Sequence, residues 1–218
     1  MARKFDLLVF DWDGTLLDST GAIVSALKSA CRDLGLFEPS TESARHVIGL
    51  GLADALRLAV PDLTEDRFPQ MVERYRHHYL TCDHDLKLFD GISLLIAELK
   101  TTGHLLAVAT GKSRLGLNRS LIHSDLVSCF SATRCADECF SKPHPQMLYE
   151  LMDECAVSPE RTLMIGDTTH DVQMAINAGA SCLAVAYGAH PAAVLDASNP
   201  TARVNSVSEA SEWLRSHT

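Results

Sequence analysis

Two carboxylates stand at the end of an apolar segment near the N-terminus. Residues 5–10 form a nearly unbroken apolar run, and Asp11 and Asp13 follow it directly, ahead of Gly14 and Thr15. Burial and like charge both penalise such a pair, so it needs a neutralising cation or a chemical task. Side chains two residues apart on an extended chain share one side, so both carboxylates face the same space.

Polar residues recur further along the chain, where apolar strands end or a loop precedes a helix. These residues are Thr110, Gly111, Lys112, Lys142, Asp167 and Asp171. Alone, each has an ordinary explanation: a turn, a solvated lysine, or carboxylates that cap a helix. Ligand sites in open parallel sheets lie beyond the carboxyl ends of the strands, so we expect these residues to converge. Clustered acids suit a hard cation such as Mg²⁺, and the lysine beside them suits a phosphate.

The elements that would position these residues alternate between strand and helix from residue 85 onwards. The predicted strands after the first are 105–110, 130–134, 162–167, 182–188 and, more weakly, 202–205. The predicted helices between and after them are 91–100, 113–123, 145–155, 170–178 and 208–215. This order predicts an α/β fold with a doubly wound (Rossmann-like) parallel sheet, and the uninterrupted apolar strands indicate that both faces are covered.

Residues 16–84 have a different pattern, with apolar residues at helical spacing and no convincing strand. The predicted helices begin at residue 18 or 19, near residue 44, at residue 53 and at residue 64. We therefore predict a catalytic α/β core formed by residues 1–15 and 85–218. An all-helical cap over residues 16–84 is inserted after the first strand, so Asp11 and Asp13 lie between the two.

Composition narrows the classes of function. The chain has 28 acidic and 19 basic residues and a formal net charge of −9, which disfavours sequence-independent binding of nucleic acid. Its seven cysteines, an odd number without a CxxC motif, indicate reduced thiols and a cytoplasmic location. No apolar run reaches the roughly 18 residues of a membrane span. We expect a small phosphorylated metabolite as partner, and no nucleic acid, membrane or obvious protein partner.

Four motifs, in order, resemble the signatures of the haloacid dehalogenase-like phosphohydrolases. They are DWDGTLLDS from Asp11, Thr110-Gly111-Lys112, Lys142-Pro143 and GDTTHDV from Gly166. The resemblance covers essentially the whole chain, including a helical segment after the first motif, and within the superfamily it points to the phosphoglycolate phosphatase-like branch. It implies hydrolysis of a small phosphate monoester through an aspartyl-phosphate, with Mg²⁺ as cofactor.

The resemblance also implies a role for each site residue. Asp11 would attack phosphorus, and Asp13 would protonate the leaving oxygen and then activate water. Mg²⁺ would bind Asp11, the backbone carbonyl of Asp13, and Asp167, while Asp171 would hold metal-bound water or Lys142. Lys142 would balance the carboxylates, orient Asp11 and help to hold the phosphate.

Substrate contacts are expected from the core and from the cap. Thr110 and the backbone N–H of Gly111 would hold the phosphoryl oxygens. The turn that contains Gly49 and Gly51 would reach the substrate, and Arg45 would either meet a substrate carboxylate or lie on the surface. Two alternatives share the scaffold: a pyrophosphatase or a β-phosphoglucomutase-like phosphomutase, and a non-catalytic regulatory protein that only binds a partner.

Overall fold

The centre of the protein is a parallel sheet with β1 in its interior. The computed structural model describes residues 4–217, and its six strands are hydrogen-bonded in the order β3-β2-β1-β4-β5-β6. Their bounds are β1 Leu7–Phe10, β2 Leu105–Thr110, β3 Ala132–Cys135, β4 Thr162–Gly166, β5 Ser181–Val185 and β6 Ala202–Val204. The predicted doubly wound sheet is confirmed. Chain order reverses at β1, between β2 and β4, and such a switch point is where ligands bind in open α/β sheets.

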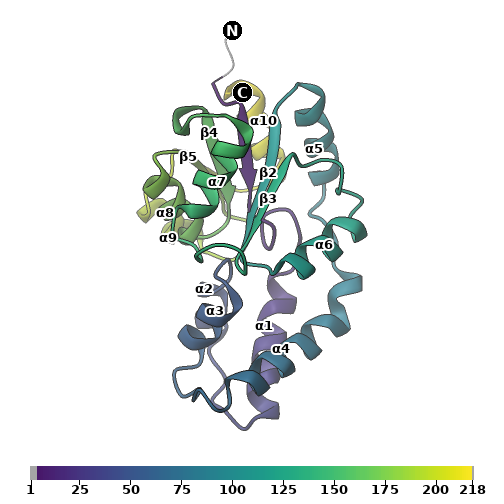
Figure 1. The fold of residues 1–218 in the computed structure, drawn as a ribbon, viewed down its shortest axis with the longest axis vertical. Coiled ribbons are helices and arrows are strands. Elements are labelled where there is room, and N and C mark those ends of the chain that lie inside the picture. Colours follow the sequence, from purple (N-terminus) through teal and green to yellow (C-terminus); the bar gives the residue numbers. More distant parts are fainter. Residues whose placement is uncertain (1–3, 218) are drawn as a thin grey trace.

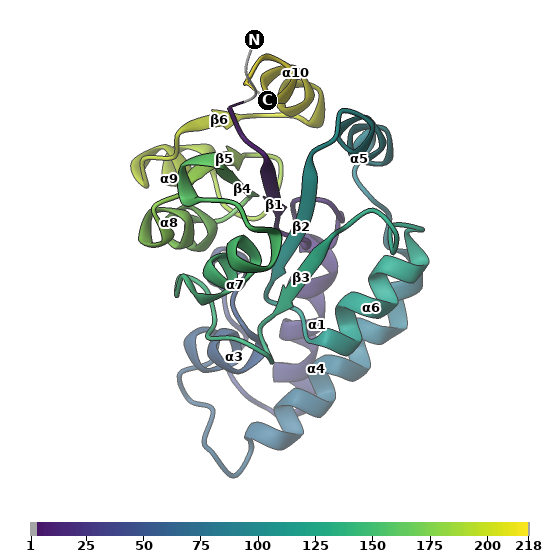
Figure 2. The same cartoon turned by 45° about the horizontal axis from the view of Figure 1, so that its top comes forward.

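Helices cover both faces of this sheet (Figures 1 and 2). One face packs against α5 (Ile92–Thr101), α6 (Arg114–His123) and α10 (Val207–His217). The other packs against α7 (Gln146–Cys155), α8 (Thr169–Ala178) and α9 (Ala192–Ala197). Successive residues of β1 serve the two faces in turn: Leu8 and Phe10 join the first cluster, and Leu7 and Val9 join the second.

A second group of helices lies beyond the carboxyl end of the sheet, below it in Figure 1. These helices are α1 Thr20–Asp33, α2 Thr41–His46, α3 Leu52–Ala59 and α4 Phe68–Cys82. They pack around a hydrophobic cluster of their own, which includes Leu27, Leu56 and Met71. We refer to residues 16–84 as the cap and to the other described residues as the core; these boundaries stay a prediction.

The chain enters and leaves the cap along two adjacent segments. Leu17 and Leu88 form an antiparallel bridge. On either side of it, the N–H of Asp18 donates to the carbonyl of Lys87 at 2.9 Å, and the N–H of Phe89 donates to that of Leu16 at 3.0 Å. The two connections therefore form one short two-stranded hinge.

Some boundaries differ from those predicted, for local reasons. Helix α4 begins at Phe68 rather than at residue 64, because residues 64–67 form a turn and Pro69 then occupies the first turn of the helix. Strand β3 begins at Ala132, and Phe130, predicted to start it, instead packs its ring against Trp12. Helix α9 was not predicted. No described helix is long and apolar enough to cross a membrane.

Candidate active site

Three buried carboxylates meet beyond the ends of β1 and β4. Asp11 follows β1, Asp167 follows β4, and Asp171 lies in the first turn of α8. One oxygen from each lies within 4.8 Å of the other two. The backbone fixes this arrangement, because the N–H of Asp11 donates to Ile165 in the neighbouring strand at 2.9 Å. The three acids that the sequence analysis expected to converge therefore lie together.

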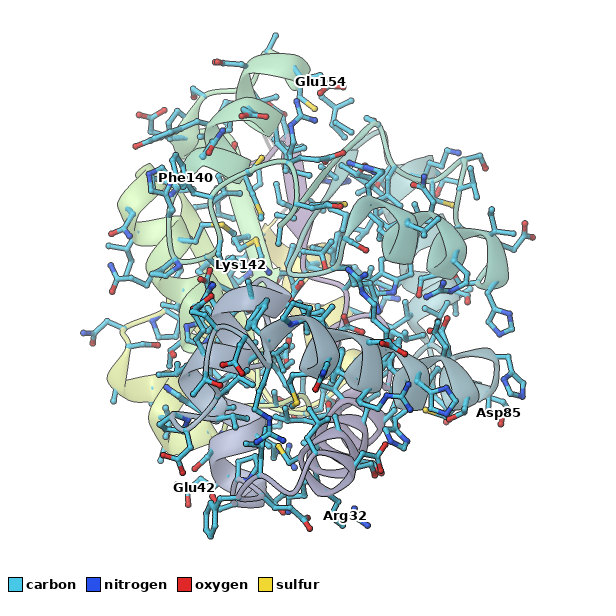
Figure 3. All side chains as sticks on the ribbon, turned by 60° about the horizontal axis from the view of Figure 1, so that its bottom comes forward. Arg32, Glu42, Asp85, Phe140, Lys142 and Glu154 are labelled. Carbon is cyan, nitrogen blue, oxygen red and sulfur yellow. The ribbon has the colours of Figure 1, made fainter. Side chains whose placement is uncertain are left out.

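Lys142 lies between two of these carboxylates and is itself buried. Its Nζ lies 2.9 Å from Oδ1 of Asp11 and 2.7 Å from Oδ1 of Asp171. Burial disfavours the charged lysine, but the two carboxylates outweigh it and raise the pKa of Lys142. Figure 3, viewed from the cap side, places Lys142 where the core meets the cap. The lysine is therefore a fixed positive charge at the centre of the site.

The carboxylates differ in how fully their oxygens are bonded. Asp171 accepts at Oδ2 from the N–H and the hydroxyl of Thr168, which caps α8. Asp167 accepts from the hydroxyl of Thr15 at 2.8 Å and from the N–H of Ala189 at 2.6 Å. Asp11 accepts at Oδ1, but its buried Oδ2 has no hydrogen-bond partner within the described chain. Oδ2 of Asp11 is thus the oxygen left open to a ligand or a substrate.

Burial shifts the proton affinity of two of these acids. Loss of hydration raises the pKa of Asp11 well above its usual range; Lys142 opposes the shift, and the neighbouring carboxylates add to it. The pKa of Asp167 rises to about 7, first through burial and then through Asp171. A bound cation removes both penalties by favouring the ionised forms. Clustered carboxylates with one unpartnered buried oxygen therefore fit Mg²⁺, which prefers oxygen ligands.

Glycines make room for the carboxylate of Asp167 on two sides. A Cβ at Gly14, which has a φ of +81°, would lie 2.2 Å from Oδ2 of Asp167. A Cβ at Gly188 would lie 2.3 Å from the same oxygen and 2.3 Å from the carbonyl oxygen of Gly14. Side chains at either position would displace Asp167, so the close approach of these loops requires glycine.

Asp13 is held by contacts that the sequence did not indicate. Its Oδ1 accepts from the hydroxyl of Ser19 at 2.6 Å and lies 3.1 Å from Nζ of Lys112. Lys112 also donates to the hydroxyl of Tyr79 in α4 at 2.9 Å. The sequence showed Lys112 in the motif that ends β2, but nothing in its pattern identified Asp13 or Tyr79 as its partner.

The cap covers the residues predicted to hold the phosphoryl group. Thr110 is buried at the end of β2. A Cβ at the next residue, Gly111, would lie 2.4 Å from the carbonyl oxygen of Leu50, so the cap turn lies directly on this loop. Gly51 donates its N–H to the hydroxyl of Ser141 at 2.8 Å, and a Cβ at Gly49 would lie 3.8 Å from Oδ2 of Asp11. The turn predicted to reach the substrate therefore lies over the carboxylates.

Arg45 lies on the surface, at the end of α2 next to the core. Its Nε donates to the carbonyl of Ala189 at 2.9 Å, and its Nη2 donates to that of Gly188 at 2.6 Å. Arg45 is not among the residues that line the cavity at Asp11. Two backbone carbonyls of the core hold its guanidinium, so Arg45 is an exposed arginine that ties the cap to the core. A contact with a substrate carboxylate stays a prediction.

Three histidines extend this attachment. The carbonyl of His46 in the cap lies 2.8 Å from Nε2 of His170 and 3.1 Å from Nε2 of His190. His190 accepts at Nδ1 from the N–H of Thr169, so its Nε2 carries the proton that the His46 carbonyl accepts. Burial lowers the pKa of His190 to about 4, which keeps the ring neutral. The sequence placed His170 beside a site motif but gave no sign of this cluster.

A cavity of about 730 Å³ opens from the carboxylates between cap and core. Asp11 and Asp13 line one end of it, together with Thr110, Gly111 and the cap turn around Leu50. The predicted nucleophile and the predicted proton carrier therefore face the same space. Trp12, between them, points away from it into the hydrophobic core.

Comparison with known proteins agrees with this geometry. The family model described as haloacid dehalogenase-like hydrolase matches residues 8–185. A probable phosphatase of Dickeya dadantii, IndB, is 36% identical over 210 residues, covering 93% of this chain and 90% of the relative. A phosphoglycolate phosphatase of Aliivibrio fischeri is 31% identical over 198 residues, covering 86% of this chain and 87% of the relative.

A solved structure shares the entire fold. The crystal structure of a predicted phosphoglycolate phosphatase from Haemophilus somnus matches with a TM-score of 0.87 and 26% sequence identity, covering 98% of this chain and 99% of that one. The four motifs, the parallel sheet and the matched family model agree. The chain belongs to the haloacid dehalogenase-like hydrolases, in their phosphoglycolate phosphatase-like branch, and is a phosphatase.

Proposed function

We propose that the protein is a Mg²⁺-dependent phosphatase that hydrolyses small phosphate monoesters through an aspartyl-phosphate on Asp11. One observation carries the proposal: Oδ2 of Asp11, a residue that lines the cavity, is buried without a hydrogen-bond partner among residues 4–217, while Lys142 holds the other oxygen. An oriented carboxylate with one open oxygen is suited to nucleophilic attack.

In the first step, an oxygen of Asp11 attacks phosphorus and the bond from phosphorus to the ester oxygen breaks. Asp13 lines the same cavity and supplies the proton that the leaving oxygen takes up. In the second step, Asp13 removes a proton from water, the water oxygen attacks phosphorus, and the bond to Asp11 breaks. Inorganic phosphate leaves, and both carboxyl groups return to their initial states.

The other residues hold the reacting groups in place. Lys142 fixes the nucleophile and balances the acids, and Thr110 with the N–H of Gly111 would hold the phosphoryl oxygens. Mg²⁺ would be held by Asp11, Asp167 and the backbone carbonyl of Asp13. Asp171 would contact it directly or through water. When bound, Mg²⁺ would neutralise the carboxylates and the phosphoryl oxygens, which is the main requirement of phosphoryl transfer.

The substitution Asp11→Asn tests the covalent mechanism. It should lower turnover by a factor on the order of 10⁴ or more, because the amide is a poor nucleophile. The matched control is Asp62→Asn, at an exposed carboxylate in the cap, which should retain full activity. Acid quenching with a radiolabelled ester should trap label on the wild-type protein and none on Asp11→Asn. Normal turnover in Asp11→Asn would refute the mechanism.

A substrate panel with Mg²⁺ separates this proposal from its alternatives. Phosphoglycolate is tested first because it is the substrate named for similar proteins, such as the phosphoglycolate phosphatase of Aliivibrio fischeri. Nucleoside phosphates, hexose phosphates and pyrophosphate follow. Phosphate release from monoesters supports the phosphatase. Release from pyrophosphate alone, or isomerisation of a hexose phosphate, would favour a pyrophosphatase or a mutase, and no reaction with any compound would favour a regulatory protein.

A further inference from the structure

The cavity that begins at Asp11 continues between apolar side chains of the cap and the core. Beyond the carboxylates, four helices line it: α1, α3 and α4 of the cap, and α6 of the core. They contribute Ile23, Leu27, Leu56, Tyr75, Leu80 and Leu115. Its volume of about 730 Å³ lies in the range of sites that enclose an entire ligand of drug-like size. A substrate as small as phosphoglycolate would leave most of these walls without contact.

Most cationic side chains that line the cavity already form hydrogen bonds or ion pairs with other residues of the protein. Lys112 is bonded to Asp13 and Tyr79, and Arg119 lies 2.5 Å from Asp83. Arg76 is exposed on α4 and is the cavity cation without an ion-pair partner among the described residues. Arg45 is engaged by core carbonyls. Among the described residues that line the cavity, Arg76 on α4 is therefore the cation left for a substrate carboxylate, and the lysine of the acid cluster, Lys142, is bonded to Asp11 and Asp171.

Exposed apolar residues of both the cap and the core line this cavity. Leu80 in α4 is 46% exposed, Leu115 in α6 is 75% exposed, and Phe140 in the loop before Lys142 is 66% exposed. Figure 3 shows Phe140 and Lys142 on the core, with Lys142 next to the cap. Exposed apolar side chains from three separate elements line this one cavity, which indicates a site that binds apolar surface.

We infer that the preferred substrates are phosphate monoesters of alcohols with an apolar body, an alkyl chain or an aryl group of at least about six carbons. The phosphoryl group lies at Asp11, and the body of the alcohol lies along the helices toward Leu80, Leu115 and Phe140. This inference rests on the proposed function, since it names the leaving group of the same reaction. Burial of each added methylene should strengthen the interaction with the walls.

Primary alkyl phosphates test the inference because lengthening the chain leaves the reacting ester almost unchanged. We compare ethyl, butyl, hexyl and octyl phosphate, below micelle-forming concentrations, with 2-phosphoglycolate, in Mg²⁺. The value of kcat/KM should rise on the order of tenfold or more from ethyl to hexyl phosphate, and should exceed that for phosphoglycolate. A flat or falling series, with phosphate still released, would overturn the inference and leave the proposed function standing. No phosphate from any ester would overturn both.

Two substitutions on one helix locate the effect. Leu115→Ser should lower the ratio of kcat/KM for hexyl to ethyl phosphate by about threefold or more, because one apolar wall is lost. Ile122→Ser is the matched control: Ile122 also lies on α6 and is 71% exposed, but it does not line the cavity. The control should leave the ratio unchanged. Equal ratios in both variants and the wild type would place the alcohol elsewhere and overturn the inference.

Discussion

On one side of the active site the cap meets the core through hydrogen bonds. On the other side apolar side chains line a cavity between cap and core, together with the Lys112–Tyr79 hydrogen bond and the Arg119–Asp83 ion pair. We call the first contact the polar seam: Arg45 and His46 of the cap, with His170 and residues 188–190 of the core. The apolar seam consists of Tyr75, Leu80, Leu115 and Phe140. The core residues of the polar seam come after β4 and β5, and those of the apolar seam come after β2 and β3, so the two groups lie on opposite sides of β1.

The polar seam is continuous with the carboxylate cluster. The N–H of Ala189 donates to the side chain of Asp167, and the N–H of His190 donates to its backbone carbonyl at 3.2 Å. The cap therefore bonds to the same loop that holds this acid. The apolar seam has no such bond to Asp167, so its side chains can vary with the substrate while the acids keep their positions. The polar seam thus keeps the acids in position, and the apolar seam selects the leaving group.

The largest effect should come from Gly188→Ala, which adds a methyl group to the polar seam where the seam contacts Asp167. The new Cβ would lie 2.3 Å from Asp167 and from the carbonyl oxygen of Gly14, so the carboxylate must shift. We expect kcat/KM to fall on the order of 100-fold and the free energy of unfolding to fall by about 1–3 kcal/mol. Steady-state kinetics and urea denaturation measure the two.

Gly21→Ala is the control for this substitution. A Cβ at Gly21, in α1, meets nothing within 4 Å, so alanine should raise stability by up to about 1 kcal/mol and leave turnover unchanged. Wild-type activity in Gly188→Ala would show that the loop accommodates the new methyl group without moving Asp167. The polar seam would then have no more influence on the position of the acids than the apolar seam has.

Arg45→Met should have the next largest effect, because it removes the charged donor of the polar seam and keeps a long apolar side chain. The loss of hydrogen bonds to Gly188 and Ala189 should cost about 1.5–3 kcal/mol of stability and lower kcat/KM about tenfold. Arg57→Met removes an exposed ion pair with Glu65 within the cap and should cost less than about 1 kcal/mol. Equal losses in the two variants would contradict a special role for the polar seam.

The smallest effect is a pH dependence of stability that comes from His190. Its pKa of about 4 in the folded protein lies below the ordinary 6.5. Between these two pH values the unfolded chain therefore binds a proton at this histidine and the folded protein does not. This contribution to stability is therefore complete above pH 6.5 and should fall by about 2 kcal/mol between pH 7 and pH 5. Asp167, with a raised pKa, contributes in the opposite direction across this range.

The variant His190→Gln isolates the histidine from the acids. Urea denaturation of both proteins at pH 7 and pH 5 gives the difference between their pH dependences. We expect the wild type to lose about 2 kcal/mol more than the variant on acidification. Parallel behaviour of the two proteins would show that His190 is protonated equally well in the fold and in the unfolded chain.

The sequence predicted the acid cluster because its cause is regular. Parallel strands present their carboxyl ends at one edge, so Asp11 and Asp167 were expected at the same edge once their strands were assigned. The polar seam has no comparable regularity. Arg45 bonds to backbone carbonyls more than 140 residues away, and a carbonyl carries no signature of residue type. For the same reason Lys112 was seen in its motif while its contact with Asp13 was not.

The hinge at Leu17 and Leu88 has a consequence for protein engineering. Directly paired residues on antiparallel strands have Cα atoms about 4.5–5.5 Å apart, a span that a two-residue Asn-Gly turn closes. The sheet and its covering helices keep their own hydrophobic clusters without any residue of α1 to α4. We therefore expect the cap to behave as a modular insert: excision behind a tight turn, or exchange for another helical segment with adjacent ends, should leave the register of every strand unchanged.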